Sequence, residues 1–129
     1  MSFLKGVHHL AVICSNYKVS KKFYTEILGF NIENEVYREE RDSYKLDLSL
    51  NGVYVVELFS FPNVPKKARR PEAAGLRQLA FKVTDSQNAV NQLPEKGIAC
   101  EPTRTDEFTG KKFTFLFDPD ELPVELYKE

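Results

Sequence analysis

Four polar side chains of types that bind divalent metals stand inside otherwise apolar segments of the chain. They are His9, Glu57, Gln78 and Glu125. The two carboxylates, in VVELF and PVELY, are the most informative, because a charge between apolar neighbours is costly to bury without a partner. An imidazole, a carboxamide and two carboxylates together make a mixed nitrogen and oxygen site that suits a divalent cation. One such residue alone would more often be structural, but the set of four predicts a metal site.

The four residues occupy equivalent positions in an internal repeat. HHLAVICSN at residues 8–16 aligns without a gap with RQLAFKVTD at 77–85, and VELFS at 56–60 aligns with VELYK at 124–128. The offset is 69 residues at the first pair and 68 at the second, which indicates that one residue is lost within the second helix. Chance likeness of short strands is the alternative. The conserved order and the nearly constant offset favour a duplication.

Each half of the repeat predicts the element order βαβββ. The first strand runs to an N-cap, Asn16 or Asp85, and a helical stretch then extends to a glycine. Strand patterns follow in each half, with Asn51-Gly52 marking a hairpin in the first half and residues 98–105 opening the series in the second. The chain is therefore predicted to be α+β, with about eight strands and two helices.

The modules are predicted to form one domain of 129 residues, a length at which a self-sufficient core is expected. Module 1 covers about 5–61, a Pro-rich linker about 62–74, and module 2 about 75–129. The linker carries a basic cluster whose simpler interpretation is solvated charge rather than an anion site. This cluster is Lys66, Lys67, Arg69 and Arg70.

Alternation along the strands separates an apolar face from the face that carries the four polar residues. Tyr54, Val56 and Leu58, for example, are expected on the apolar side of the segment that contains Glu57. His9 rather than His8 aligns with Gln78, because each stands seven residues before its N-cap. His8 is expected to be packed or to lie at the strand edge.

The composition narrows the class of protein. Hydrophobic residues make up 42% and charged residues 29%, with a net charge of −1, which excludes a disordered chain and argues against nucleic acid as the main partner. No apolar run approaches the roughly 20 residues needed to cross a bilayer, so no membrane partner is expected. The predicted location is the cytoplasm. Cys14 and Cys100 lack CxxC spacing and are expected to be buried free thiols.

Several segments of the chain together resemble those of a known superfamily. HHLAVICSN…FYTEILGF, VYVVELFSF, GLRQLAFKVTD and DPDELPVELYK are similar to signature segments of glyoxalase I and its relatives, the vicinal oxygen chelate (glyoxalase/bleomycin resistance/dioxygenase) superfamily. The likeness covers essentially the whole chain and is nearest to small bacterial lactoylglutathione lyase-like proteins. It implies two pseudo-symmetric βαβββ modules that form an incomplete eight-stranded, barrel-like sheet around a metal cleft, commonly in a homodimer.

The resemblance also implies functional residues. The family's four ligand positions match His9, Glu57, Gln78 and Glu125, which would bind one divalent ion per chain, Zn, Ni, Co or Mn. Many bacterial relatives carry histidine where this chain has Gln78, so a glutamine that stays off the metal is the alternative.

The implied reaction, known from methylglyoxal detoxification, is isomerisation of a hemithioacetal, formed from a 2-oxoaldehyde and a thiol such as glutathione, to a 2-hydroxyacyl thioester. Glu125 matches the proton shuttle, with Glu57 as the pseudo-symmetric alternative. Arg38, Arg41 and Arg77 are candidate contacts for an anionic substrate, although exposed arginines are usually only solvated.

Other activities occur on the same scaffold, and fold alone does not decide between them. A ring-cleaving dioxygenase and a thiol transferase acting on an antibiotic epoxide both need two histidines, and the single matched histidine disfavours them. A drug-sequestering protein needs no metal, and the matched carboxylates argue against it. The main alternative is a metal-binding member that acts on another thiol adduct or serves as a small-molecule binding or resistance protein.

Overall fold

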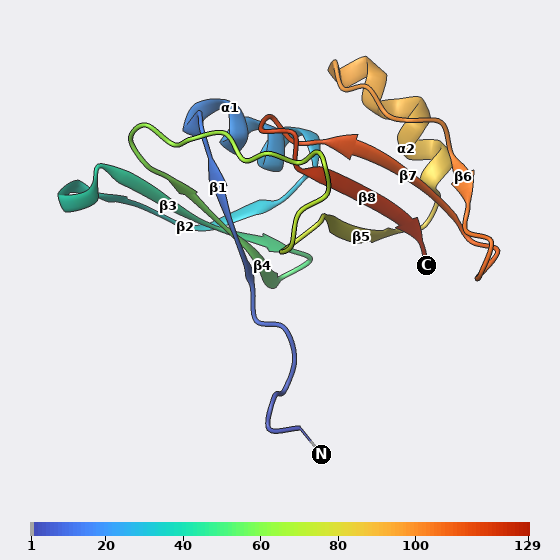
Figure 1. Ribbon diagram of the computed structural model, residues 1–129, viewed down its shortest axis with the longest axis horizontal. Coiled ribbons are helices and arrows are strands. Elements are labelled where there is room, and N and C mark those ends of the chain that lie inside the picture. Colours follow the sequence, from blue (N-terminus) through green and yellow to red (C-terminus); the bar gives the residue numbers. More distant parts are fainter. Residues whose placement is uncertain (1) are drawn as a thin grey trace. The chain divides into compact units, whose positions relative to one another are not determined.

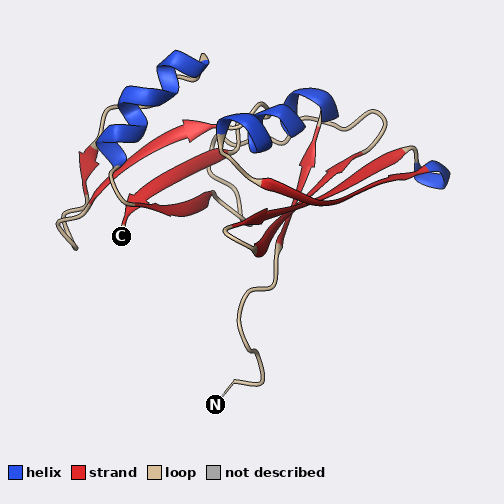
Figure 2. Cartoon of the chain, turned by 180° about the vertical axis from the view of Figure 1, so that it is seen from behind, coloured by secondary structure: helices blue, strands red, loops and turns tan. Residues whose placement is uncertain are grey.

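The computed structural model describes residues 2–129 and divides into two compact units, the first ending at Lys67 and the second beginning at Ala68. This boundary falls inside the Pro-rich segment 62–74. Each unit contains one four-stranded sheet and one principal helix (Figures 1 and 2). Among the described residues the strands form two mixed sheets and no closed barrel.

The first unit has the order βαβββ that the sequence predicts. Its elements are β1 (Leu10–Cys14), α1 (Tyr17–Lys22) continued by the π-helix η1 (Phe23–Ile27), β2 (Asn31–Arg38), the short 3-10 helix η2 (Glu39–Arg41), β3 (Ser43–Leu50) and β4 (Val53–Ser60). Asn16 caps α1 by accepting a hydrogen bond from the Val19 N–H. Asn51 and Gly52 both have positive φ, as the two-residue hairpin between β3 and β4 requires.

The second unit repeats this order. Its elements are β5 (Leu79–Val83), α2 (Ser86–Gln92) with the 3-10 turn η3 (Leu93–Lys96), β6 (Arg104–Thr105), β7 (Lys112–Phe117) and β8 (Pro123–Lys128). Asp85 caps α2 by accepting hydrogen bonds from the N–H groups of Gln87 and Asn88. Pro94 has no N–H to continue the α-helical pattern, and the helix tightens into η3 there.

The sheet orders confirm the duplication. They are β1-β4-β3-β2 in the first unit and β5-β8-β7-β6 in the second, with the first strand of each unit parallel to the last. The registers also correspond, since Ala11 lies opposite Glu57 and Ala80 lies opposite Glu125. The predicted α+β class and the two βαβββ modules are therefore confirmed.

The expected apolar faces form the cores. In the first unit α1 packs against β4, and in the second α2 packs against β7 and β8. The buried strand residues include Val12 and Cys14 on β1, Leu46 and Leu48 on β3, Val56 and Leu58 on β4, and Leu79, Leu116, Val124 and Leu126 in the second unit. Each such side chain contributes about 1.5–3 kcal/mol relative to exposure. Burial on this side fixes the register and turns Glu57 and Glu125 to the opposite face.

Two local predictions were wrong. Residues 98–105 were expected to form a strand, but only Arg104–Thr105 pairs regularly with β7. Pro102 interrupts this segment because proline donates no ladder hydrogen bond. Cys14 is buried as expected, and its thiol donates to the Phe59 carbonyl, whereas Cys100 is only half-buried. This partial burial raises the pKa of the Cys100 thiol, because it disfavours the charged thiolate.

The segment before β1 leaves the sheet of its own unit as an extended arm (Figure 1). Three large apolar side chains on it are strongly exposed, Phe3 at 90%, Leu4 at 70% and Val7 at 83%. His8 and His9 lie at the base of this arm, immediately before β1. Among residues 2–129 there is no helix long and apolar enough to cross a membrane.

Candidate metal centre

His9 and Glu57 come together within the first unit because β1 runs parallel to β4. Glu57 lies opposite Ala11, so His9, which immediately precedes β1, reaches the carboxylate on the neighbouring strand. His9 Nε2 is 3.6 Å from Glu57 Oε1, and the two side chains are 35% and 15% exposed. Two atoms that bind the same ion at about 2.1 Å lie about 3–3.5 Å apart. This pair therefore has a separation close to that of two ligands of one ion.

The imidazole of His9 is oriented by two aromatic neighbours. Its Nδ1 lies 2.8 Å from Nδ1 of His8, and its ring stacks on Tyr54 with centroids 5.1 Å apart. One ring must donate and the other accept in this contact, so the tautomers of His8 and His9 are linked, and Nε2 of His9 faces Glu57. His8, which was expected only to be packed or at the strand edge, thus contacts the candidate ligand directly.

Three further polar side chains surround Glu57. The Tyr54 hydroxyl lies 3.2 Å from both Asp47 Oδ1 and Glu57 Oε2, and Lys45 Nζ lies 2.8 Å from Asp47 Oδ1 and 3.4 Å from Glu57 Oε2. Asp47 and Glu57 are direct cross-strand neighbours, a like-charge arrangement that is unfavourable alone. The Lys45 ammonium lies against both carboxylates and offsets their repulsion.

The protonation of these donors follows from their surroundings. Burial is the largest cause that raises the pKa of Tyr54, and the charges of Asp47 and Glu57 raise it further. The hydrogen bond to Asp47 is the largest cause that raises the pKa of Lys45. Tyr54 therefore stays a neutral hydroxyl donor and Lys45 stays a cation at neutral pH.

Tyr54 reaches this cluster because β4 carries a bulge. The ladder between β3 and β4 shifts register between Leu48 and Ser49, which pair with Val56 and Tyr54 respectively. An extra residue in one strand reverses the alternation beyond it. The expectation that Tyr54 shares the apolar face of Val56 and Leu58 was therefore wrong, since its hydroxyl bonds to Glu57.

Gln78 and Glu125 form the corresponding pair in the second unit. Gln78 Nε2 donates to Glu125 Oε1 at 3.1 Å, and Arg77 Nη1 donates to Gln78 Oε1 at 2.5 Å. The amide oxygen, which is the atom that could bind a metal, is thus held by Arg77. An amide oxygen has two lone pairs, so a metal bound by Gln78 would have to share this oxygen with the Arg77 guanidinium. Arg77 is also paired with Glu72 at 3.0 Å.

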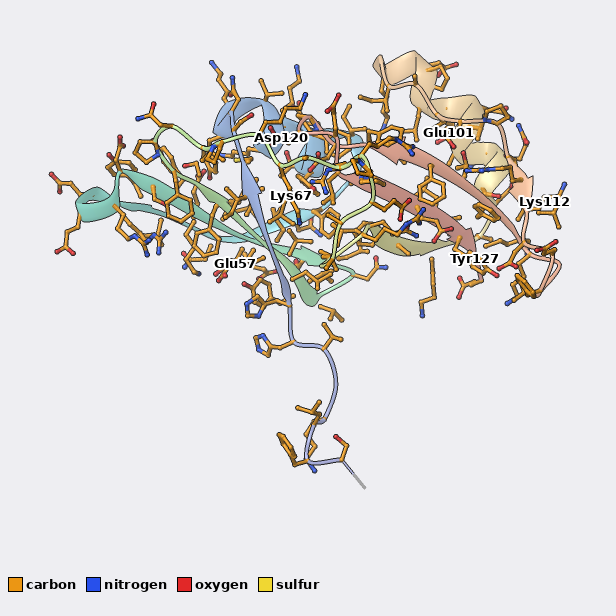
Figure 3. All side chains as sticks on the ribbon, viewed as in Figure 1. Glu57, Lys67, Glu101, Lys112, Asp120 and Tyr127 are labelled. Atoms are coloured by element: carbon orange, nitrogen blue, oxygen red, sulfur yellow. The ribbon has the colours of Figure 1, made fainter. Side chains whose placement is uncertain are left out.

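The neighbours of Glu125 on the adjacent strand are aromatic, although the charge of Arg77 also acts on it. Phe115 lies opposite Glu125 in the ladder, where Asp47 lies opposite Glu57, and Phe113 lies opposite Tyr127. The rings of Phe113 and Tyr127 stack with centroids 6.2 Å apart, and the Arg104 guanidinium lies over Phe113 at 5.3 Å. Figure 3 labels Glu57 and Tyr127, which belong to the two different units.

The other candidate anion contacts lie at the far end of the first sheet. Arg38 Nη2 donates to Ser43 Oγ at 2.8 Å, and its guanidinium lies 4.8 Å from the Phe59 ring. Arg41 lies over Phe61 at 5.2 Å. Arg38 is thus partly engaged by the protein itself, while Arg41 at the end of η2 is exposed to solvent.

The four predicted ligands are therefore found as two pairs, His9 with Glu57 and Gln78 with Glu125. Among the described residues no single group of three or more His, Cys, Asp or Glu side chains could hold a metal. Sequence reasoning missed the contacts made by Lys45, Asp47 and Tyr54. The alternation of SYKLDLSL could have indicated the contacts of Lys45 and Asp47, because it places these two residues on the other face of the strand from the buried Leu46 and Leu48.

Comparison with known proteins places the chain in a family. The model of the Glyoxalase/Bleomycin resistance protein/Dioxygenase superfamily matches residues 6–126. The chain is 64% identical over 126 residues to the uncharacterized protein YwkD of Bacillus subtilis and 57% identical over 126 residues to the uncharacterized protein YaeR of Escherichia coli, each match covering 98% of both chains. The crystal structure of a glyoxalase family protein from Enterococcus faecalis is 48% identical, with a TM-score of 0.89 over 98% of this chain and 99% of that one. The chain belongs to the glyoxalase/bleomycin resistance protein/dioxygenase superfamily.

Proposed function

We propose that the chain is a metal-dependent lyase of the glyoxalase I type, converting the hemithioacetal of a 2-oxoaldehyde and a thiol into a 2-hydroxyacyl thioester. The observation that carries this proposal is the matched placement of Glu57 and Glu125. Each carboxylate lies on the last strand of its unit, opposite an alanine of the first strand. Each also contacts the polar side chain that immediately precedes the first strand of its unit. Duplicated apolar strands have no structural need for such a pair of carboxylates.

The proposed ligand set for one divalent ion is His9, Glu57, Gln78 and Glu125, and we propose that residues 1–129 act as one glyoxalase-like domain. His9, Glu57 and Glu125 fit the ion by chemistry, since they supply one imidazole nitrogen and two carboxylates. Gln78 is the weakest member, because Arg77 holds its amide oxygen. When bound, the ion would polarise the substrate oxygens and stabilise the enediolate that forms when the carbon loses its proton.

Glu125 is proposed to move the proton. Its carboxylate would take the proton from the carbon that bears sulfur and return it to the adjacent carbonyl carbon, so that the hemithioacetal of the 2-oxoaldehyde isomerises to a 2-hydroxyacyl thioester without net oxidation. Phe115 opposite it and the neighbouring Tyr127 give the second-unit face an apolar lining. Such a lining limits the access of water to the reacting carbon.

The activity is tested by following thioester formation from methylglyoxal. Glutathione and bacillithiol-type thiols are each offered to protein loaded with nickel, cobalt, manganese or zinc. We expect turnover with at least one combination of thiol and metal, and loss of that turnover after treatment with a chelator. Bound metal without thioester formation across the whole panel would remove the isomerase proposal.

The aromatic face of the second unit favours one second candidate function. Phe113, Phe115 and Tyr127 with Arg104 present stacked rings and a guanidinium, which suit a planar small molecule. A metal-binding member that acts on another thiol adduct, or a small-molecule binding or resistance protein, would use this face in the same way. Tight ligand binding without turnover in the assay above would favour this function.

We propose that the protein acts in the cytoplasm as a homodimer. The arm before β1 supports this, because Phe3, Leu4 and Val7 are exposed on a segment that leaves its own sheet. Covering three such side chains against a second copy would contribute about 1.5–3 kcal/mol each.

Replacing these three residues with serine is therefore expected to raise the dimer dissociation constant at least tenfold, because two arms are lost per dimer. Sedimentation equilibrium measures the change. The control is Phe108→Ser in the second unit, where Phe108 is 89% exposed. This control is expected to leave the dissociation constant unchanged. Equal dissociation constants in all three proteins would refute a role for the arm.

A further inference from the structure

The two glutamates of the proposed site occupy equivalent positions in the repeat but have different neighbours. Glu57 lies opposite Asp47, beside Lys45 and Tyr54, whereas Glu125 lies opposite Phe115. The residue that corresponds to Tyr54 at the offset of 68 is Leu122, which is buried in the second unit. The duplication has therefore kept the carboxylates and changed the groups around them.

The two oxygens of Glu57 have separate partners. Oε2 lies 3.2 Å from the Tyr54 hydroxyl and 3.4 Å from Lys45 Nζ, while Oε1 faces Nε2 of His9 at 3.6 Å. A carboxylate held in this way at one oxygen has little freedom to rotate. The oxygen that remains is directed toward the candidate imidazole ligand.

Asp47 keeps the two donors aimed at Glu57. It accepts from Lys45 Nζ through both of its oxygens, at 2.8 and 3.0 Å, and from the Tyr54 hydroxyl at 3.2 Å. The Tyr54 ring is fixed in addition by its stacking on His9. One network thus joins the candidate imidazole and the candidate carboxylate of the first unit.

We infer that Tyr54 and Lys45 are positioning residues that hold Oε2 of Glu57 and present Oε1 alone to the divalent ion. The inference rests on the metal-site part of the proposed function. It also separates the roles of the two carboxylates. Glu57 is a fixed ligand with one oxygen engaged by two donors of the protein, whereas Glu125 accepts from Gln78 Nε2, lies opposite Phe115 and interacts with the charge of Arg77, and it keeps the proposed role in proton transfer. Groups that orient ligands from behind in this way commonly change metal affinity by about 10- to 100-fold when removed.

Tyr54→Phe is the sharpest test, because it removes the hydroxyl and keeps the ring that stacks on His9. We expect Co²⁺ affinity, measured by competition with a chromophoric chelator, to fall about 10-fold or more. The visible absorption spectrum of the bound Co²⁺ is expected to change as well, because Glu57 would be free to bind through both oxygens. The matched control is Tyr44→Phe. Tyr44 lies on β3 and stacks on Tyr17 at 4.3 Å, away from Glu57, and its variant is expected to match the unchanged protein.

Lys45 provides an independent second test. Lys45→Met should lower Co²⁺ affinity in the same direction, and Lys45→Arg, which keeps a cation against Asp47 and Glu57, should restore most of it. This rescue separates positioning from a simple loss of packing. Circular dichroism and thermal unfolding establish that each variant is folded before its affinity is compared. If Tyr54→Phe does not fold, the Lys45 variants alone test the inference.

The outcomes distinguish this inference from the proposed activity. Unchanged Co²⁺ affinity and spectrum in both Tyr54→Phe and Lys45→Met would overturn the inference, as would failure of the unchanged protein to bind Co²⁺. Reduced affinity in these variants, together with an unchanged protein that binds metal and forms no thioester, would support the positioning role and remove only the isomerase proposal.

Discussion

Glu57→Ala is expected to lose most of its divalent metal, from about one ion per chain to a small fraction when the protein is purified without chelator. Removing one of four ligands from a site worth about 10–16 kcal/mol costs on the order of 3 kcal/mol, or about 100-fold in affinity. The variant also leaves Asp47 as the remaining carboxylate partner of both Lys45 and the Tyr54 hydroxyl. Elemental analysis of the purified protein measures the loss.

Glu33→Ala is the matched control for this variant. Glu33 lies on β2 of the same sheet, where it is exposed and accepts a hydrogen bond from Ser49 rather than from the candidate ligands. Its metal content is expected to equal that of the unchanged protein. Normal occupancy in Glu57→Ala would contradict the proposed ligand set.

Glu125→Gln is expected to lower kcat about 10²- to 10⁴-fold, the usual contribution of a positioned general base. The glutamine keeps an oxygen that can accept from Gln78 Nε2, so the local hydrogen bond and the fold should survive. What is lost is the carboxylate that takes up the proton. The measurements are the kcat of the metal-loaded variant and the solvent deuterium incorporated into the thioester.

Glu101→Gln is the control for proton transfer in the second unit. Glu101 pairs with Arg104 at 2.8 Å on the surface and is placed outside the site. Its kcat is expected to be unchanged. A Glu125→Gln enzyme that retains its metal and full kcat would assign proton transfer to another group, with Glu57 the first candidate by pseudo-symmetry.

The duplicated architecture could be predicted because its signals are local and occur twice. Asn16 and Asp85 both cap helices, and Asn51-Gly52 has the positive φ values of a tight hairpin. Strict alternation then separated the buried residues from the face that carries Glu57 and Glu125. These features depend on the nearest neighbours in the chain, which the sequence states directly.

The surroundings of Glu57 could not be predicted in full, because they depend on how strands meet. Tyr54 changes face through a bulge on β4, and no residue type in VYVVELF marks that position. The contact between His8 and His9 likewise depends on the path of the chain before β1. The irregular course of residues 98–103 follows from pairing along β7 that Pro102 disrupts.

A crystal structure of the metal-loaded protein, with anomalous scattering recorded at the absorption edge of the metal, tests the central claim most directly. We predict one anomalous peak per chain, with His9 Nε2, one oxygen each of Glu57 and Glu125, and the amide oxygen of Gln78 about 2.0–2.2 Å from it. A peak bound by the other three with Gln78 still held by Arg77 would correct the set to three protein ligands. A metal bound elsewhere, or without either glutamate, would contradict the account.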